Sequence, residues 1–226
     1  MIVLFTIWLI KKFNGYHATK NNFLIKNRLI HTQSSILLIL FLSTGTPLVS
    51  QHQTLHYKVI HNGNSVGKIQ LQHTKDGNDV FIKVTSDIKM RFLINFQVNA
   101  EEDAHYHEGK LVYSQVHRFV NGKSRTNKST KALDGSYQLN DDGKITSFNY
   151  KQINCTVSMM YVMEPYAMAE IYSDYYQQFI RIKKVTDHKY RLFLPDGNYN
   201  DYTYVNGVCN IVDVHHSMYT VQIQLS

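Results

Sequence analysis

Cysteine is scarce in this chain of 226 residues, which contains only Cys155 and Cys209. Two cysteines allow one intramolecular disulfide at most, so a small scaffold held together by many disulfides is excluded. In an exported chain the two could form a disulfide that ties the middle of the chain to its last hairpin. Cysteine is also a common buried apolar residue, and spacing gives no geometry, so both interpretations stay open.

Acidic residues are absent from the first fifty residues, which hold five of the 24 basic residues. Residues 51–226 therefore carry 19 basic and 17 acidic side chains, a formal net charge of +2, although the pI of the whole chain is about 9.2. A near-neutral domain lacks the basic surface typical of nucleic-acid binding. We predict no nucleic-acid partner, and a single domain with a real core.

The chain also lacks an apolar run long enough to span a membrane, which takes about 20 residues. The run Ile36–Leu42 follows a basic stretch and precedes Gly45, Pro47 and Ser50, the order typical of a secretory signal peptide. We predict cleavage after Ser50, which leaves an exported chain with no stable membrane span, in the periplasm or outside the cell. No cysteine lies near residue 50, which excludes a lipid-modified bacterial N-terminus.

The stretch ahead of this apolar run is too long for an ordinary signal peptide of about 15 to 30 residues. It includes a second apolar patch, Ile2–Ile10. A start assigned upstream of the true one explains the length best. An extended leader and a membrane-contacting N-terminal segment are the alternatives. The predicted organisation is a leader over residues 1–50 and one β-rich domain over residues 51–226.

The glycines of the chain occur at positions typical of hairpin turns. Eight of the nine glycines after residue 50 follow Asn, Asp or Glu. Asn-Gly and Asp-Gly supply the positive φ angles that tight hairpin turns need, so each pair predicts a chain reversal. Between the turns apolar and polar residues alternate, most clearly over residues 88–101, which we interpret as one long strand. One polar face on each strand favours an antiparallel sheet over a parallel one.

One segment, Asn154–Tyr176, differs from the rest and is called the insert below; it holds four of the seven Met and five of the sixteen Tyr. We predict a short helix in it, capped by Asn154 or Thr156 and stopped where Glu164 meets Pro165. The predicted fold is mainly β. It is a single curved antiparallel sheet, a half-barrel or open barrel, with a short helical insert packed against it.

Within the insert, Met160, Tyr161 and Met163 are candidate ligand contacts. Methionine is a flexible gap-filler, and tyrosine combines apolar area with a polar tip. These side chains either fill irregular space under the sheet, which is the usual role of apolar residues at helical spacing, or line a pocket. The functional hypothesis is a pocket for an apolar small molecule or a lipid. We predict no cofactor.

A second candidate site consists of Asp103, His105 and His107, which period two places on one face of a strand with Glu101. Two histidines in this spacing can bind zinc or iron, and His117 is a candidate further ligand from the next strand. This would make the protein a metal-dependent or hydrolytic enzyme. A polar, solvent-facing strand is the plainer interpretation, so we predict no metal and no catalytic residue.

The motif Gly63-Asn64-Ser65-Val66-Gly67 matches the G-x-S-x-G pattern of nucleophilic serines. That pattern requires a strand before the serine and a helix after it. Here Asn62-Gly63 predicts a hairpin turn, and residues 68–73 alternate like a strand. The match is therefore interpreted as a hairpin.

From Leu55 to the end, the chain carries a set of residues that is fairly specific. They are Tyr57, Val59, Asn62, Gly63, Val66 and Gly67 in the first hairpin, Ser158, Tyr161, Glu164 and Pro165 in the insert, and Leu194–Asn198, Asn200, Tyr202, Tyr204, Asn206 and Gly207 near the end. With them the chain resembles a family of exported Bacteroidetes proteins described only as a domain of unknown function. At Asp174 it departs from the glutamate expected there. The resemblance implies no activity and no catalytic residue.

More loosely, the layout is similar to periplasmic half-barrels of the lipoprotein-carrier type, in which a curved sheet and helical segments enclose an apolar cavity. This implies an apolar ligand, a lipid or a lipid-modified partner, although fold alone does not fix function. The predicted function is an exported, non-enzymatic β-domain of the cell envelope. The alternatives are the enzyme described above and a surface glycan-binding or adhesin module. The oligomeric state stays open.

Overall fold

The structure is a computed structural model that describes residues 50–91, 95–149 and 152–226. The predicted signal peptide, and the leader up to residue 49, lie outside the described residues. Within these three ranges, no helix has the length and apolar character needed to cross a membrane.

The chain forms one antiparallel sheet of 14 strands, as the alternating pattern predicted, arranged as two meanders. The first comprises β1 (Gln51–His61), β2 (Asn64–Asp76), β3 (Asp79–Arg91), β4 (Asn95–His107), β5 (Lys110–Val120), β6 (Lys123–Leu133), β7 (Ser136–Asp141) and β8 (Lys144–Phe148). The second comprises β9 (Glu170–Ser173), β10 (Gln178–Thr186), β11 (Lys189–Phe193), β12 (Tyr199–Val205), β13 (Val208–His216) and β14 (Tyr219–Leu225). Pairing of β1 with β14 joins the meanders and leaves β8 and β9 as the outer strands, so the sheet is not closed into a barrel.

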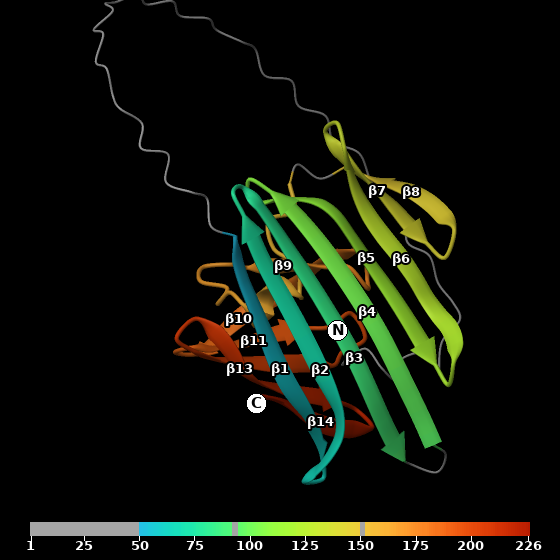
Figure 1. Ribbon diagram of the computed structural model, residues 1–226, viewed down its shortest axis with the longest axis vertical. Coiled ribbons are helices and arrows are strands. Elements are labelled where there is room, and N and C mark those ends of the chain that lie inside the picture. The colour runs from blue at the N-terminus through green and yellow to red at the C-terminus, as the bar shows by residue number, and fades with distance from the viewer. Residues whose placement is uncertain (1–49, 92–94, 150–151) are drawn as a thin grey trace, which may run out of the picture.

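The two meanders enclose the core between them. Figure 1 shows the long strands β1–β6 in front, with β10, β11 and β13 running across behind them. Large side chains from both meanders meet in this space, and Tyr57, Leu71, Tyr202 and Ile223 are among those with 1% or less of their surface exposed. Burying one large apolar side chain contributes about 1.5–3 kcal/mol, so this concave interior holds the fold together.

The glycine pattern correctly predicted the hairpins. All eight glycines that follow Asn, Asp or Glu have positive φ and lie between consecutive paired strands. Gly67 is different, because a Cβ there would lie 2.6 Å from the backbone oxygen of Asp87 on the neighbouring strand. The G-x-S-x-G match is thus a turn at Gly63 followed by strand β2, in which Ser65 is exposed. As predicted, no helix follows that serine.

The single long strand predicted over residues 88–101 was wrong. β3 ends at Arg91, β4 begins at Asn95, and the two pair antiparallel with Met90 opposite Phe96. Residues that pair across this hairpin are an even number of positions apart in the sequence. The alternation of inward-facing and outward-facing residues along β3 therefore continues into β4 without a break. No glycine or proline marks the reversal either. Alternation alone could not distinguish one strand from two.

The predicted helix in the insert is much shorter than expected. It is one 3-10 turn, Met159–Tyr161, preceded by Ser158 and without a side-chain cap. The Thr156 hydroxyl instead bonds to the Tyr106 hydroxyl at 2.7 Å and to Ser158 Oγ at 2.8 Å. The proposed capping residue is therefore used in a buried polar contact. The insert does pack against the sheet, as predicted.

The two cysteines are both buried and unpaired. Burial, followed by the charge of Asp174, raises the pKa of the Cys155 thiol to about 12. Burial also raises the pKa of Cys209. Both cysteines act as small apolar core residues, which is the second of the two interpretations that the sequence left open.

Candidate functional site in the concave interior

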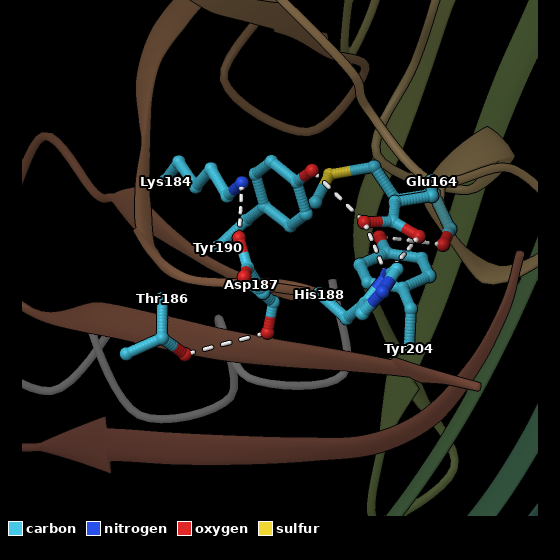
Figure 2. A network of polar contacts seen from close by, with 8 residues as sticks. Glu164, Lys184, Thr186, Asp187, His188, Tyr190 and Tyr204 are labelled. Carbon is cyan, nitrogen blue, oxygen red and sulfur yellow. Dashed lines mark hydrogen bonds and ion pairs between the residues drawn. The ribbon is translucent and has the colours of Figure 1, made fainter.

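Two hydrogen-bonded contacts fasten the insert to the second meander. The carboxylate of Glu164 accepts hydrogen bonds from the Tyr190 hydroxyl at 2.9 Å and from His188 Nδ1 at 3.1 Å (Figure 2). The Tyr204 hydroxyl donates to the backbone oxygen of Met160 at 2.9 Å. The position of the insert is therefore set by side chains of β11, β12 and the turn before β11.

The charge of Glu164 is maintained by these contacts. Burial acts to raise its pKa, but hydrogen bonds from Tyr166, His188 and Tyr190 outweigh burial and lower the pKa below its ordinary value. A carboxylate that accepts several hydrogen bonds is stabilised in its ionised form. Glu164 therefore serves as an ionised anchor whose acceptor positions are already used within the fold.

The three predicted ligand contacts of the insert lie at different depths. Met160 is fully buried and Tyr161 is 3% exposed, while Met163 is half-buried. The ring of Tyr161 packs edge-on against Tyr57, with centroids 5.2 Å apart, and against Tyr202, with centroids 6.3 Å apart. The structure thus places Met160 and Tyr161 in an aromatic part of the interior and Met163 at its border.

Glu102 on β4 points into the same interior. It is only 3% exposed, and its Oε1 atom has no hydrogen-bond partner among the described residues. Burial is the main cause that raises its pKa to about 8, and the nearby Asp174 adds to the effect. Burial is also the main cause that raises the pKa of Tyr202, and the charge of Glu102 adds to it.

Asp174 and Asn200 line a small cavity in the interior. The cavity measures about 10 Å³, enough for one water-sized sphere, and its other walls include Ile180 and Leu192. Asp174 is 6% exposed and accepts a hydrogen bond from Ser114 Oγ. Burial raises its pKa to about 6. Asn200 is 1% exposed, and its amide interacts with the Tyr202 hydroxyl without a hydrogen bond of standard geometry among the described residues.

Together Glu102, Asp174 and Asn200 form what we call the inner polar site. Most buried polar groups in native proteins are hydrogen-bonded, and an unsatisfied one costs about 1–3 kcal/mol. Asp174 is hydrogen-bonded to Ser114, whereas one oxygen of Glu102 has no hydrogen-bond partner among the described residues. The site therefore offers hydrogen-bonding capacity that the described part of the fold does not use.

The predicted metal residues lie on the opposite, outer face of β4. His105 Nε2 and His107 Nδ1 both contact the same oxygen of Asp79, at 2.7 Å and 3.0 Å. The ring of His105 also stacks on Phe81, with centroids 4.5 Å apart. The structure thus brings the two histidines together on a carboxylate of β3 that the sequence did not single out.

The other two predicted ligands lie away from this pair. Asp103 accepts a hydrogen bond from Gln115 at 2.8 Å, and His117 is the strand partner of Glu101. Across the described ranges, no group of three histidine, cysteine or acidic side chains is arranged to hold a metal ion.

A family model for a domain of unknown function, DUF6134, matches residues 57–226. The chain belongs to the DUF6134 family. The prediction of a family described only as a domain of unknown function is thereby confirmed. The match covers nearly all of the folded sheet, so the inner polar site lies within the DUF6134 domain. No curated protein matches the chain.

Among solved structures, this DUF6134 domain is similar to a β-barrel-like protein of the domain of unknown function DUF1849 from Brucella abortus. The two are 11% identical, and the match covers 77% of this chain and 95% of that chain with a TM-score of 0.48.

Sequence reasoning did not identify the inner polar site of this DUF6134 domain. The sequence contained one signal. Glu102 is an even number of positions from Val98 and Ala104, so it lies on the same buried face of β4. A carboxylate on the apolar face of a strand is an exception that needs a partner. Asn200 and Asp174 stood out only through the family resemblance, and nothing local indicated that they meet Glu102.

Proposed function

We propose that this DUF6134 domain is an exported, non-enzymatic binding protein of a Bacteroidetes cell envelope. It holds an apolar or amphipathic small molecule, or a lipid, in its concave interior, in the manner of carrier-type half-barrels. The observation that carries the proposal is the pair of buried side chains with unused hydrogen-bonding atoms, Glu102 and Asn200, in an interior lined mostly by aromatic and apolar residues. A ligand with an apolar body and one polar group would satisfy both.

The insert is the part of the domain that makes room for such a ligand. Met160 and Tyr161 occupy the interior, and Met163 lies at its border. Methionine side chains change rotamer easily and re-pack around different shapes. The apolar body of the ligand takes the place of these methionines and contacts the aromatic rings of Tyr57 and Tyr202, while Glu164 keeps the end of the insert fastened.

Native mass spectrometry of the purified protein, taken from an envelope fraction and then denatured, tests the proposal. We expect a mass excess of a lipid-like molecule that disappears on denaturation. A bare polypeptide mass in both states would count against the binding role. An excess of one metal ion would instead favour an enzyme that uses Asp103, His105 and His107.

Substitution in the insert provides the matched test. We expect Met160→Ala and Met163→Ala to reduce the fraction of protein that carries the bound molecule. The control is Met218→Ala, because Met218 is 68% exposed in the turn between β13 and β14. Equal ligand capture by all three variants and the wild type would show that the insert does not form the pocket.

A further inference from the structure

One turn of the second meander reaches the far strands of the first meander. This turn, residues 174–177, follows β9 and is called the β9 turn below. The Gln177 amide donates to backbone oxygens of β6 and β7, at 2.9 Å and 3.0 Å. Asp174 accepts a hydrogen bond from Ser114 Oγ on β5. Because β8 and β9 are the outer strands of the open sheet, these side-chain contacts take the place of a backbone ladder.

The backbone of the β9 turn is strained. Gln177 has a φ angle of 52°, in the left-handed region that residues other than glycine adopt infrequently. Its backbone N–H donates to the backbone oxygen of Ser173 at 2.7 Å, so this bond is local to the turn. Strained residues persist only where the surrounding structure holds them in place. The closed position of the β9 turn therefore depends on its side-chain contacts with β5, β6 and β7.

Asp174 is the member of these contacts whose charge changes near neutral pH. It is 6% exposed, and its partner Ser114 is 1% exposed. Burial is the main cause that raises the pKa of Asp174 to about 6, and the hydrogen bond from Ser114 acts in the opposite direction. The charge of Asp174 in turn raises the pKa of acidic groups on three elements, which are Glu102 and Tyr106 of β4, Cys155 of the insert and Tyr172 of β9.

The cations that face the β9 turn from the first meander contact Tyr175. The guanidinium of Arg118 on β5 lies 6.0 Å from the centre of its ring, and Lys128 Nζ on β6 lies 5.5 Å from it. From β12, Asn200 lines the same small cavity as Asp174. Arginine and lysine keep their charge near neutral pH, so the contacts with Tyr175 hold the turn without adding a pH dependence there.

We propose that the β9 turn is a pH-sensitive latch, closed on β5 by the neutral form of Asp174 and released by its ionised form. When the turn opens, the carboxyl group enters water and regains its ordinary acidity. A group that binds its proton more tightly in the closed form favours closure at low pH, and this contribution is lost as the pH rises through about 6. The latch goes beyond the proposed binding function and stands whether or not the interior holds a ligand.

Amide hydrogen exchange of the purified protein at about pH 5 and about pH 7, followed by mass spectrometry, tests the latch. Dividing each rate by the intrinsic rate at the same pH leaves only the structural opening. From a pKa of 3.8 in the open turn and about 6 in the closed turn, we expect opening of the β9 turn to increase about tenfold between the two conditions. Glu102, with a pKa of about 8, stays largely protonated over this range.

Two variants assign the effect to Asp174. Asp174→Asn keeps the shape of the side chain and removes its charge, so opening of the turn should be equal at the two pH values. Ser114→Ala removes a donor that favours the ionised form, so it should increase opening about fivefold more at the higher pH than at the lower. Asp187→Asn is the matched control, because the side chain of Asp187 is 88% exposed in the turn between β10 and β11. This control should keep the pH response of the wild type.

Equal corrected exchange at the two pH values in the wild type would overturn the latch, and so would a pH response that persists in folded Asp174→Asn. A response of the same size in all strands would show an effect on global stability and would also overturn it. If Asp174→Asn does not fold, the wild type and Ser114→Ala decide. Identical pH responses of these two proteins would overturn the role of Asp174.

Discussion

Glu102 combines two properties that are rarely compatible with a stable interior. It is almost completely buried, and one of its carboxyl oxygens has no partner among the described residues. The fold tolerates the group because burial raises its pKa to about 8, so that the side chain is largely neutral at physiological pH. The unused oxygen remains a cost to stability, which a ligand could relieve.

The pH dependence of stability should reveal this group. Because the pKa of Glu102 is about 8 in the folded state and near its ordinary value of 4.5 in the unfolded state, folding holds the proton more tightly. Its contribution to stability is therefore complete below pH 4.5 and is lost as the pH rises through about 8. We expect Glu102→Gln to reduce the fall in unfolding free energy between about pH 5 and 8 by a few kcal/mol, measured by urea titration.

Asp174 provides the internal check on that result. Its pKa is raised from 3.8 to about 6 by burial, so its contribution is lost over a lower pH range than that of Glu102. Glu102→Gln should therefore retain the decline around pH 6. If the pH profile of Glu102→Gln is identical to that of the wild type, Glu102 does not titrate as a buried group.

Gly67 is a residue-scale constraint of another kind. A Cβ at this position would lie 2.6 Å from the Asp87 backbone oxygen and 2.8 Å from Ile88 Cα, so two strands would have to separate. Overpacking of this kind typically costs about 1–3 kcal/mol. We expect Gly67→Ala to lower the unfolding free energy by at least that amount in urea titration. Ser65→Ala, at an exposed position of the same strand, should change it by less than about 0.5 kcal/mol.

At the scale of elements, the insert is fixed by polar side chains more than by secondary structure. The insert contains one helical turn, Met159–Tyr161, and ends in the short strand β9. An isolated bridge pairs Thr156 near its start with Tyr172 on β9. Ahead of β9, the insert is also held by the hydrogen bonds of Glu164 with Tyr190 and of the Met160 backbone oxygen with Tyr204 (Figure 2). An element held in this way can be loosened by removing a few side-chain contacts.

Removal of one such contact should loosen the insert. Tyr204→Phe leaves the buried backbone oxygen of Met160 without its donor, which costs about 1–3 kcal/mol. We expect a lower unfolding free energy and faster proteolysis within the insert. Lys184→Ala is the control, because the ion pair of Lys184 with Asp187 lies on the exposed surface and should contribute little to stability. Equal effects of the two substitutions would contradict the anchoring role.

At the scale of the whole molecule, the sheet is open, and side chains of β9 and of the turn after it contact β6 and β7 across what we call the seam. The Tyr172 hydroxyl contacts Thr130 Oγ1 at 3.0 Å, across from β9 to β6. The Gln177 amide donates to the backbone oxygens of Ser129 and Asn140, at 2.9 Å and 3.0 Å. Side chains rearrange more easily than a backbone ladder, so we expect the seam to open more readily than the paired strands.

Hydrogen exchange should detect this seam. Gln177→Ala removes both amide hydrogen bonds, and a net loss of about 1–1.5 kcal/mol corresponds to roughly tenfold faster local opening. We expect faster amide exchange in β7, β8 and β9 and unchanged exchange in β3 and β4. Gln178→Ala changes the exposed neighbouring residue and should have no effect. Uniformly faster exchange over all strands would show that Gln177 supports global stability instead.

The sequence by itself determined the local features of this protein. Asn-Gly and Asp-Gly pairs determined the positions of most hairpins, because few residues adopt a positive φ angle. The alternation of apolar and polar residues determined which side chains of each strand face the core. The same alternation placed His105 and His107 outside and should have drawn attention to Glu102 inside. It could not reveal the reversal between Arg91 and Asn95, because the parity of the side chains continues through that hairpin.

Only the tertiary structure decided how distant segments meet. Pairing of β1 with β14 joins the two ends of the domain and folds the second meander behind the first. That arrangement places the insert inside and brings Glu102, Asp174 and Asn200 into one interior. No local pattern could specify this, because it depends on contacts between segments that lie far apart in the chain.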